Sequence, residues 1–169
     1  MQIPEALDAT HPESWWQSFF QEHLTTILQG YTGCFPKVNI SAGRTKFPDF
    51  LLGTTMGYLD ILEIKKPSTP LLRRGTAGKN YYWSKELSAA ISQVQHYLAA
   101  IQEHSFRISA YLREAYQQDL RIVRPKGLLI AGDSRRFSCA EEKDGFRLLS
   151  QSIGDIRFIT YDELLYSFI

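Results

Sequence analysis

Apolar residues recur every three to four positions in two long segments, which is the spacing of an amphipathic helix. The first segment follows the capping-box pattern Thr10-His-Pro-Glu13 and predicts a helix that runs to about Gln29 and stops at Gly30. The second segment predicts a helix from Ser84 to about Gln102. The residues expected in the core are Trp15, Trp16, Phe19, Phe20, His23, Leu24, Ile27 and Leu28 from the first helix, and Leu87, Ala90, Ile91, Val94, Leu98 and Ile101 from the second.

Shorter apolar runs bounded by Gly and Pro predict strands. Residues 47–52 and 58–65 are two such runs around a turn bracketed by Gly53 and Gly57, which predicts an antiparallel hairpin. The pattern also predicts a strand over 37–40 and a helix over 106–118. The residues of that helix expected to face inward are Ile108, Tyr111, Leu112 and Tyr116. Further along, it predicts a buried strand over 127–131, a helix over 141–152, a strand over 157–160 and a short terminal helix. A strand, a helix and a strand of these lengths imply a crossover between two parallel strands.

The expected fold class is therefore α/β, an α+β arrangement on a mixed sheet. Its order is helix-strand-strand-strand-helix-strand, with an added helix-strand-helix at the C-terminus. A chain of 169 residues is about the size of one domain. We expect residues 1–10 to be a lead-in or linker and residues 11–169 to be the domain.

Composition narrows the class of protein but not its partner. Hydrophobic residues make up 44% of the chain and charged residues 22%, as in ordinary globular proteins. The net charge of +1 means that nucleic-acid binding has to rest on local patches. Cys34 and Cys139 lack zinc-site spacing and fit a reducing compartment. The chain has no leader pattern and no apolar run of ~18 residues, so we expect a cytoplasmic protein without a membrane partner.

Three charged residues in the predicted hairpin point to phosphodiester hydrolysis. Because side chains alternate along a strand, Glu63 and Lys65 share one face, and the hairpin can bring Asp49 level with them. Two neighbouring carboxylates suit a hard divalent cation such as Mg²⁺. A lysine beside the ion can orient or help to deprotonate water and can stabilise charge on the phosphorus oxygens. The alternative is a surface Asp49 and an ordinary ion pair between Glu63 and Lys65.

These residues also resemble a known nuclease signature. Pro48-Asp49, followed after the hairpin by Glu63-Ile64-Lys65, is similar to the PD-(D/E)XK motif. Gln93-Val-Gln-His-Tyr97 resembles the Q-x-x-x-Y element of several nucleases of this superfamily. The segments 125–132 and 159–164 resemble the later strands and closing helix of the nuclease domain of Shedu anti-phage defence proteins, so the similarity runs from about Glu13 to Leu164.

This resemblance implies a restriction-endonuclease-like core and a metal-dependent DNA endonuclease in bacterial anti-phage defence. Asp49 and Glu63 would hold Mg²⁺ or Mn²⁺ with help from the Ile64 carbonyl, Lys65 would serve the water, and Gln93 would assist. Tyr97 would lend packing and a hydroxyl. Members of this family are expected to assemble, so a homo-oligomer is implied. The alternatives are a catalytically silent DNA-binding or regulatory module of the same fold, and a nuclease acting on RNA or on branched DNA.

Two further groups of residues are candidates at the site. Superfamily members often carry a carboxylate on the first helix, and Glu13 lies about 60° from the centre of its apolar stripe, which favours an inward position; a capping role is the alternative. The loop after Lys65 is rich in Pro, Gly and Ser. It carries the basic residues Lys66, Arg73, Arg74 and Lys79, which can grip a DNA backbone. The alternative is a solvated loop.

Other charged or aromatic residues have simpler interpretations. Asp162 and Glu163 at the start of the terminal helix are explained by helix capping. Arg135 and Arg136 follow the buried strand and fit an ordinary solvated turn. The aromatic pair Trp15-Trp16 and the segment 81–83 offer contact surfaces for an oligomer, unless they are internal.

Overall fold

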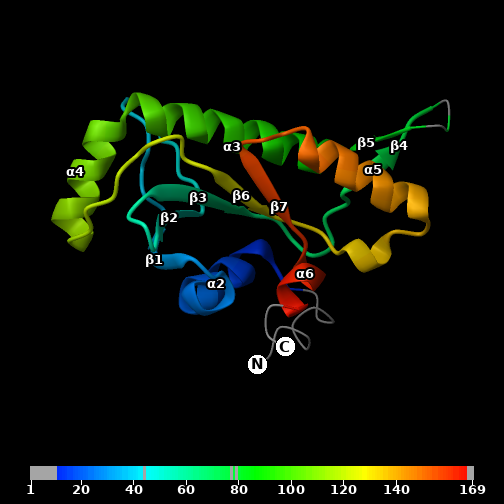
Figure 1. The fold of residues 1–169 in the computed structure, drawn as a ribbon, viewed down its shortest axis with the longest axis horizontal. Helices are drawn as coiled ribbons and strands as arrows, with labels where there is room; N and C mark the ends of the chain where they lie inside the picture. The colour runs from blue at the N-terminus through cyan, green and yellow to red at the C-terminus, as the bar shows by residue number, and fades with distance from the viewer. Residues whose placement is uncertain (1–10, 44, 77, 79, 167–169) are drawn as a thin grey trace.

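A five-stranded mixed sheet forms the centre of the protein (Figure 1). The structure is a computed structural model and describes residues 11–43, 45–76, 78 and 80–166. The sheet order is β1-β2-β3-β6-β7, in which β1–β2 and β2–β3 are antiparallel and β3–β6 and β6–β7 are parallel. The strands are β1 (Tyr31–Pro36), β2 (Phe50–Thr54), β3 (Leu59–Ile64), β6 (Gly127–Ile130) and β7 (Ile156–Ile159).

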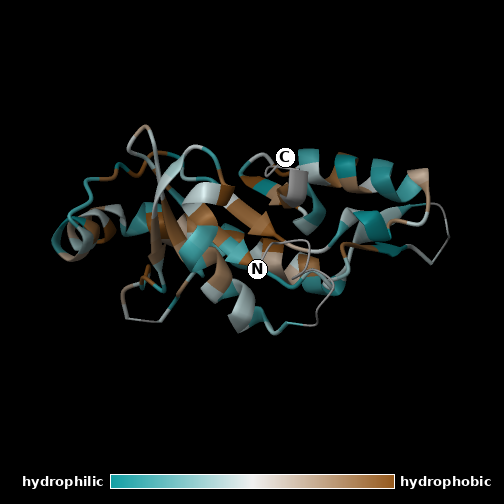
Figure 2. Cartoon of the chain, turned by 90° about the horizontal axis from the view of Figure 1, so that it is seen from below, coloured by the Kyte–Doolittle hydropathy of each residue, from teal (hydrophilic) through white to brown (hydrophobic). Residues whose placement is uncertain are grey.

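Helices cover both faces of the sheet. Helix α3 (Lys85–Glu103) lies along one face, and α2 (Glu13–Ile27) and α6 (Tyr161–Tyr166) lie on the other (Figure 1). On the α3 face, Leu59 and Ile61 of β3 belong to one hydrophobic cluster; on the α2 face, Leu62 and Ile64 belong to a second. All six residues of β3 are buried. The hydrophobic strands accordingly occupy the centre of Figure 2.

The expected order of the longer elements is confirmed, and a small hairpin is added to it. Between β3 and α3 the chain inserts the antiparallel strands β4 (Leu72–Arg74) and β5 (Tyr81–Trp83). Between α3 and β6 lies α4 (Ser105–Tyr116), which confirms the helix predicted over 106–118. The predicted strand-helix-strand crossover is confirmed as β6, α5 (Ala140–Gln151) and β7. No helix in the described part of the chain is long and apolar enough to cross a membrane.

Helix α3 matches its prediction because its start is encoded locally. The Ser84 side chain accepts a hydrogen bond from the Leu87 backbone N–H at 3.0 Å, which caps the first turn. All six residues expected in its core stripe are buried. Helix α2 instead begins after Pro12 without a side-chain cap, and Thr10 of the expected capping box lies outside the described residues.

Two predictions about individual segments are wrong. The first strand spans Tyr31–Pro36 and not 37–40, because Lys37 adopts a left-handed backbone with φ of 50° that ends the pairing with β2. Val38 and Ile40 are buried in a loop instead. In α4, Ile108 is buried as expected, but Tyr111 and Tyr116 are exposed because α4 packs at one end of the sheet (Figure 1).

The segment after Lys65 is not a featureless loop. Arg73 and Arg74 lie on β4, and the hairpin packs on the body of the domain through Trp83, whose ring stacks on Phe158 at 4.9 Å between centroids. Lys79 of this segment lies outside the described residues. Three-residue strands are too short for a periodic signal to reveal.

Gly127 sets how closely α3 approaches the sheet. A methyl group at this position would overlap Cγ1 of Val94, so α3 would have to shift. We expect Gly127→Ala to lower the free energy of unfolding by about 1–3 kcal/mol, measured by urea denaturation. Gly154→Ala is the matched control because open space surrounds Gly154. Equal stability of the two variants would contradict the close packing of α3 on β6.

Candidate functional site

The end of β3 brings the three predicted hairpin residues together. Asp49 directly precedes β2, and its Oδ2 accepts a hydrogen bond from the Ile64 backbone N–H at 2.9 Å. Glu63 Oε1 accepts from Lys65 Nζ at 3.0 Å. Asp49 and Glu63 are almost fully buried, whereas the Lys65 side chain is 22% exposed. The hairpin therefore places two buried carboxylates and an ammonium at one edge of the sheet.

One oxygen of Glu63 has no partner. Oε2 is buried and accepts no hydrogen bond from the described residues. Burial, and then repulsion from Asp49, raises the pKa of Glu63 to about 7, although Lys65 opposes the shift. An orphan carboxylate oxygen in a dry site is costly unless a cation or a proton meets it. Oε2 of Glu63 is therefore the position in the site at which a bound cation would be stabilised.

Lys65 remains a cation in this setting. Burial lowers the pKa of its ammonium, but the charges of Glu63, Glu13 and Asp49 and the hydrogen bond to Glu63 together raise it above the ordinary value. Glu13 contributes from α2, with its Oε1 3.9 Å from Lys65 Nζ. The first-helix carboxylate thus lies beside the lysine and not against Asp49.

Asp49 is held by two residues that the sequence pattern did not single out. Its Oδ1 accepts from Gln17 Nε2 at 2.7 Å and from Lys37 Nζ at 2.8 Å. Gln17 comes from α2 and Lys37 from the turn after β1, 32 and 12 residues away in sequence. The only local signal is a polar residue, Gln17, directly after the buried Trp16 of the aromatic helix face.

The donor set fits a hard divalent cation with few protein ligands. No group of three or more His, Cys, Asp or Glu that could hold a metal occurs among the described residues. Two carboxylates with one unpartnered oxygen match Mg²⁺, which keeps several waters and takes one or two carboxylates from the protein. They do not match a four-ligand zinc site.

Gln93 and Tyr97 of α3 form a pair beside the site. Gln93 Nε2 donates to the Tyr97 hydroxyl at 2.6 Å, and that hydroxyl donates to the Phe47 carbonyl at 3.3 Å. Burial raises the pKa of Tyr97, and the negative charges of Glu63 and Asp49 raise it further, which places the ring within their field. Tyr97 therefore fixes the Gln93 amide and links α3 to the chain just before Asp49.

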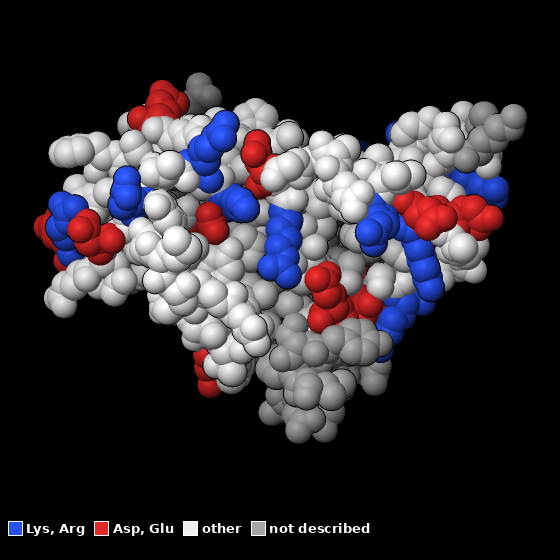
Figure 3. Space-filling model, in the orientation of Figure 1, with Lys and Arg blue, Asp and Glu red and all other residues white. Residues whose placement is uncertain are grey.

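The basic residues after Lys65 are exposed. Lys66, Arg73 and Arg74 all face solvent; Arg73 lies over the Tyr82 ring at 5.2 Å, and Arg74 donates to the Gly78 carbonyl. On the face drawn in Figure 3, basic and acidic side chains are interspersed and form no continuous patch of one sign. An anion that binds on this face would therefore contact single Lys or Arg side chains and not a continuous basic patch.

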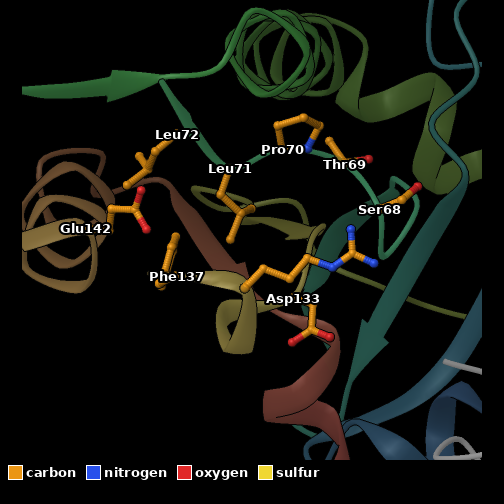
Figure 4. A pocket seen from close by; sticks show the side chains of 9 residues that line it. Ser68, Thr69, Pro70, Leu71, Leu72, Asp133, Phe137 and Glu142 are labelled. Atoms are coloured by element: carbon orange, nitrogen blue, oxygen red, sulfur yellow. The ribbon is translucent and has the colours of Figure 1, made fainter. Parts of the chain in front are cut away.

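A cavity of about 250 Å³ lies between the turn after Lys65 and α5 (Figure 4). Its lining includes Ser68 and Thr69 at one end and Glu142 at the other, with Asp133 and Arg136 contributed by the turn after β6. Asp133 is already bound by Arg135, which lowers its pKa. One guanidinium and two carboxylates give this cavity no excess positive charge.

The terminal acids have partners other than their own helix. Asp162 accepts from the Ser134 backbone N–H at 2.7 Å and from the Ser134 hydroxyl at 2.5 Å. Glu163 lies 3.9 Å from Arg157. Both acids thus make structural contacts with Ser134 and Arg157.

Comparison with known proteins identifies the family of this chain. None of the curated proteins matches the chain. The family described as "Shedu protein SduA, C-terminal" matches residues 10–165, which is most of the chain and includes every described residue of the site. The chain therefore belongs to the Shedu family, in its SduA C-terminal region.

Proposed function

We propose that this protein is a metal-dependent DNA endonuclease. The observation that carries the proposal is the buried pair Asp49 and Glu63, with one oxygen of Glu63 unpartnered and Lys65 3.0 Å from the other. Shedu membership supports a role in anti-phage defence. A purely structural ion pair between Glu63 and Lys65 would not explain why a second carboxylate is buried beside them.

Asp49 and Glu63 would hold Mg²⁺ or Mn²⁺, with the Ile64 carbonyl as a further ligand. When bound, the ion supplies Lewis-acid activation of the phosphodiester. The chain supplies the remaining positioning. Gln17 and Lys37 orient the Asp49 carboxylate, and the Ile64 N–H fixes its second oxygen.

Lys65 is the group that faces the attacking water. Its Nζ is fixed by Glu63 and lies near Glu13, so it needs little rearrangement to orient water or to stabilise charge that develops on phosphorus oxygens. Gln93, fixed by Tyr97, assists from α3 by donating to a water or to a phosphate oxygen.

DNA would lie along the edge where β3 ends. Lys66 follows the site directly, and the β4–β5 hairpin presents Arg73 and Arg74 to solvent. Because Trp83 packs the β4–β5 hairpin against the domain, these arginines lie on an ordered hairpin and not on an unsupported loop. They would contact phosphates and give affinity without reading the base sequence.

Plasmid cleavage tests this function directly. We expect supercoiled plasmid to be nicked or linearised with Mg²⁺ or Mn²⁺ and to stay intact with EDTA. Asp49→Asn should lower the rate by at least about 10²-fold, because the metal loses a charged ligand. Asp144→Asn, on the exposed surface of α5, is the control.

The same assay separates the other readings. Cleavage that persists in EDTA or in Asp49→Asn would reject the assigned site, and DNA binding without cleavage would indicate a silent DNA-binding module. Parallel reactions with linear duplex, single strand, four-way junction and RNA identify the substrate. Light scattering tests assembly into a homo-oligomer. Two of the aromatic residues considered as contact surfaces are internal: Trp16 is buried, and Trp83 packs against Phe158.

A further inference from the structure

Lys37 connects the solvent to a buried acid of the site. Its side chain is 54% exposed, yet its ammonium lies 2.8 Å from Oδ1 of Asp49, whose side chain is 6% exposed. The two residues are joined a second time, because the Lys37 backbone N–H donates to the Asp49 carbonyl at 3.2 Å. No pattern in the sequence predicts this pairing, since Lys37 lies in a turn.

The backbone at Lys37 is unfavourable for a residue with a side chain. Its φ of 50° lies in the left-handed region, which Gly adopts readily and Lys rarely adopts. Two neighbouring contacts hold it there: the hydrogen bond to the Asp49 carbonyl and the end of the β1–β2 pairing at Pro36. Strain of this kind concentrates at functional sites. Here it directs a flexible cation at the candidate metal ligand.

An ammonium and a divalent cation compete for the same carboxylate. Oδ1 of Asp49 accepts from Lys37 Nζ and Gln17 Nε2, and Oδ2 accepts from the Ile64 N–H, so a cation that binds Asp49 shares this carboxylate with the Lys37 ammonium. Two positive charges on one carboxylate repel each other. The neutral amide of Gln17 can stay, whereas the ammonium of Lys37 is pushed away on its four-carbon stem.

We propose that Lys37 is a phosphate-binding residue that pairs with Asp49 until a divalent cation binds. Without the cation Lys37 neutralises Asp49; when the cation binds the Asp49 carboxylate, Lys37 moves to a phosphodiester oxygen of the bound DNA. This inference rests on the proposed nuclease function. It makes cation binding and DNA binding support each other, because the released ammonium gains a new anion. A permanent Lys37–Asp49 ion pair would give no such coupling.

Lys37→Met tests the proposal with binding measurements alone. Duplex DNA affinity is measured by fluorescence anisotropy over a series of salt concentrations, once in EDTA and once in Ca²⁺, and the DNA is checked on a gel for cleavage. Mn²⁺ affinity of the DNA-free protein is measured by calorimetry. Lys126→Met is the matched control. Lys126 is exposed and directly precedes β6, at the end of the sheet opposite to the site.

Lys37→Met should bind Mn²⁺ roughly three- to tenfold more tightly than wild type, because its competitor is gone. In Ca²⁺ it should bind DNA more weakly, with a salt slope smaller by about one. In EDTA its DNA affinity should match wild type, because Asp49 holds Lys37 there. Lys37→Arg retains the charge and should keep the Ca²⁺-dependent affinity, which separates loss of charge from misfolding.

Two results would overturn the inference. One is a Lys37→Met variant whose DNA affinity and Mn²⁺ affinity both equal those of wild type; the other is an equal loss of DNA affinity in EDTA and in Ca²⁺. If wild type binds Mn²⁺ and cleaves DNA in either case, the proposed function survives and only the role of Lys37 fails. If wild type does neither, both are rejected.

Discussion

Lys65→Ala is expected to lower the rate of Mg²⁺-dependent DNA cleavage by about 10²–10⁴-fold, the loss that follows removal of a positioned proton-transfer or charge-stabilising group. Its ammonium lies 3.0 Å from Glu63, and its side chain is 22% exposed, so Lys65 reaches the site from within the protein and remains accessible to water. The rate is measured under single-turnover conditions on a labelled duplex. DNA affinity should change by only about the contribution of one cation.

A second substitution at the same position separates two roles of Lys65. Lys65→Arg keeps the positive charge but cannot take up or release a proton, because the guanidinium stays charged. Recovery of most of the rate by Arg would assign charge stabilisation, and no recovery would favour proton transfer or exact shape. Lys126→Ala is the control, and a Lys65→Ala enzyme as fast as this control would remove Lys65 from the site.

Glu63→Gln should stabilise the metal-free protein at alkaline pH and abolish its response to metal. The folded-state pKa of Glu63, about 7, lies above its ordinary value of 4.5, so folding favours the protonated form. The stability that Glu63 contributes is fully present below pH 4.5 and is lost as pH rises to about 7. The loss is on the order of 3 kcal/mol. Gln carries no charge at any of these pH values, so the Glu63→Gln variant does not lose this stability.

Thermal and urea unfolding in EDTA, from pH 5 to pH 8, measure this difference. The advantage of Glu63→Gln over wild type should grow across that range. Saturating Mn²⁺ should then reverse the order at pH 8, because an ion that binds only the folded state at 1,000 times its Kd adds about 4.1 kcal/mol to wild type. Glu114→Gln, on the exposed surface of α4, is the control. A constant difference between the variants at all pH values would contradict the burial of a charged Glu63.

Locally encoded features were predictable from the sequence. Ser84 and the apolar stripe behind it define α3 within one stretch of chain, and the continuous apolar run of β6 identifies a strand buried on both faces. The alternation in β3 assigned Ile61 to one face and Leu62 to the other. The contact between Asp49 and the end of β3 followed from the hairpin, because antiparallel pairing fixes which residues meet.

Features that depend on distant contacts were not predictable. The alternating Val38 and Ile40 suggested a strand, but pairing with β2 ends at Pro36 and their burial comes from a loop. The partners of Asp49, Gln17 and Lys37, come from other elements, and their side chains carry no periodic signal. Asp162 was interpreted as a helix cap, but its hydrogen-bond partner is Ser134, 28 residues earlier.

The burial of β3 bears on control of the proposed cleavage. Every residue of this strand is buried, and strands on both sides pair with it, so moving Glu63 would require disrupting the sheet. The groups around Glu63 come from other elements: Glu13 and Gln17 from α2, and Lys37 from the turn after β1. Under the proposed function, a partner that tilts α2 would withdraw Glu13 and Gln17 and lower the cleavage rate, while Glu63 stays in place on β3.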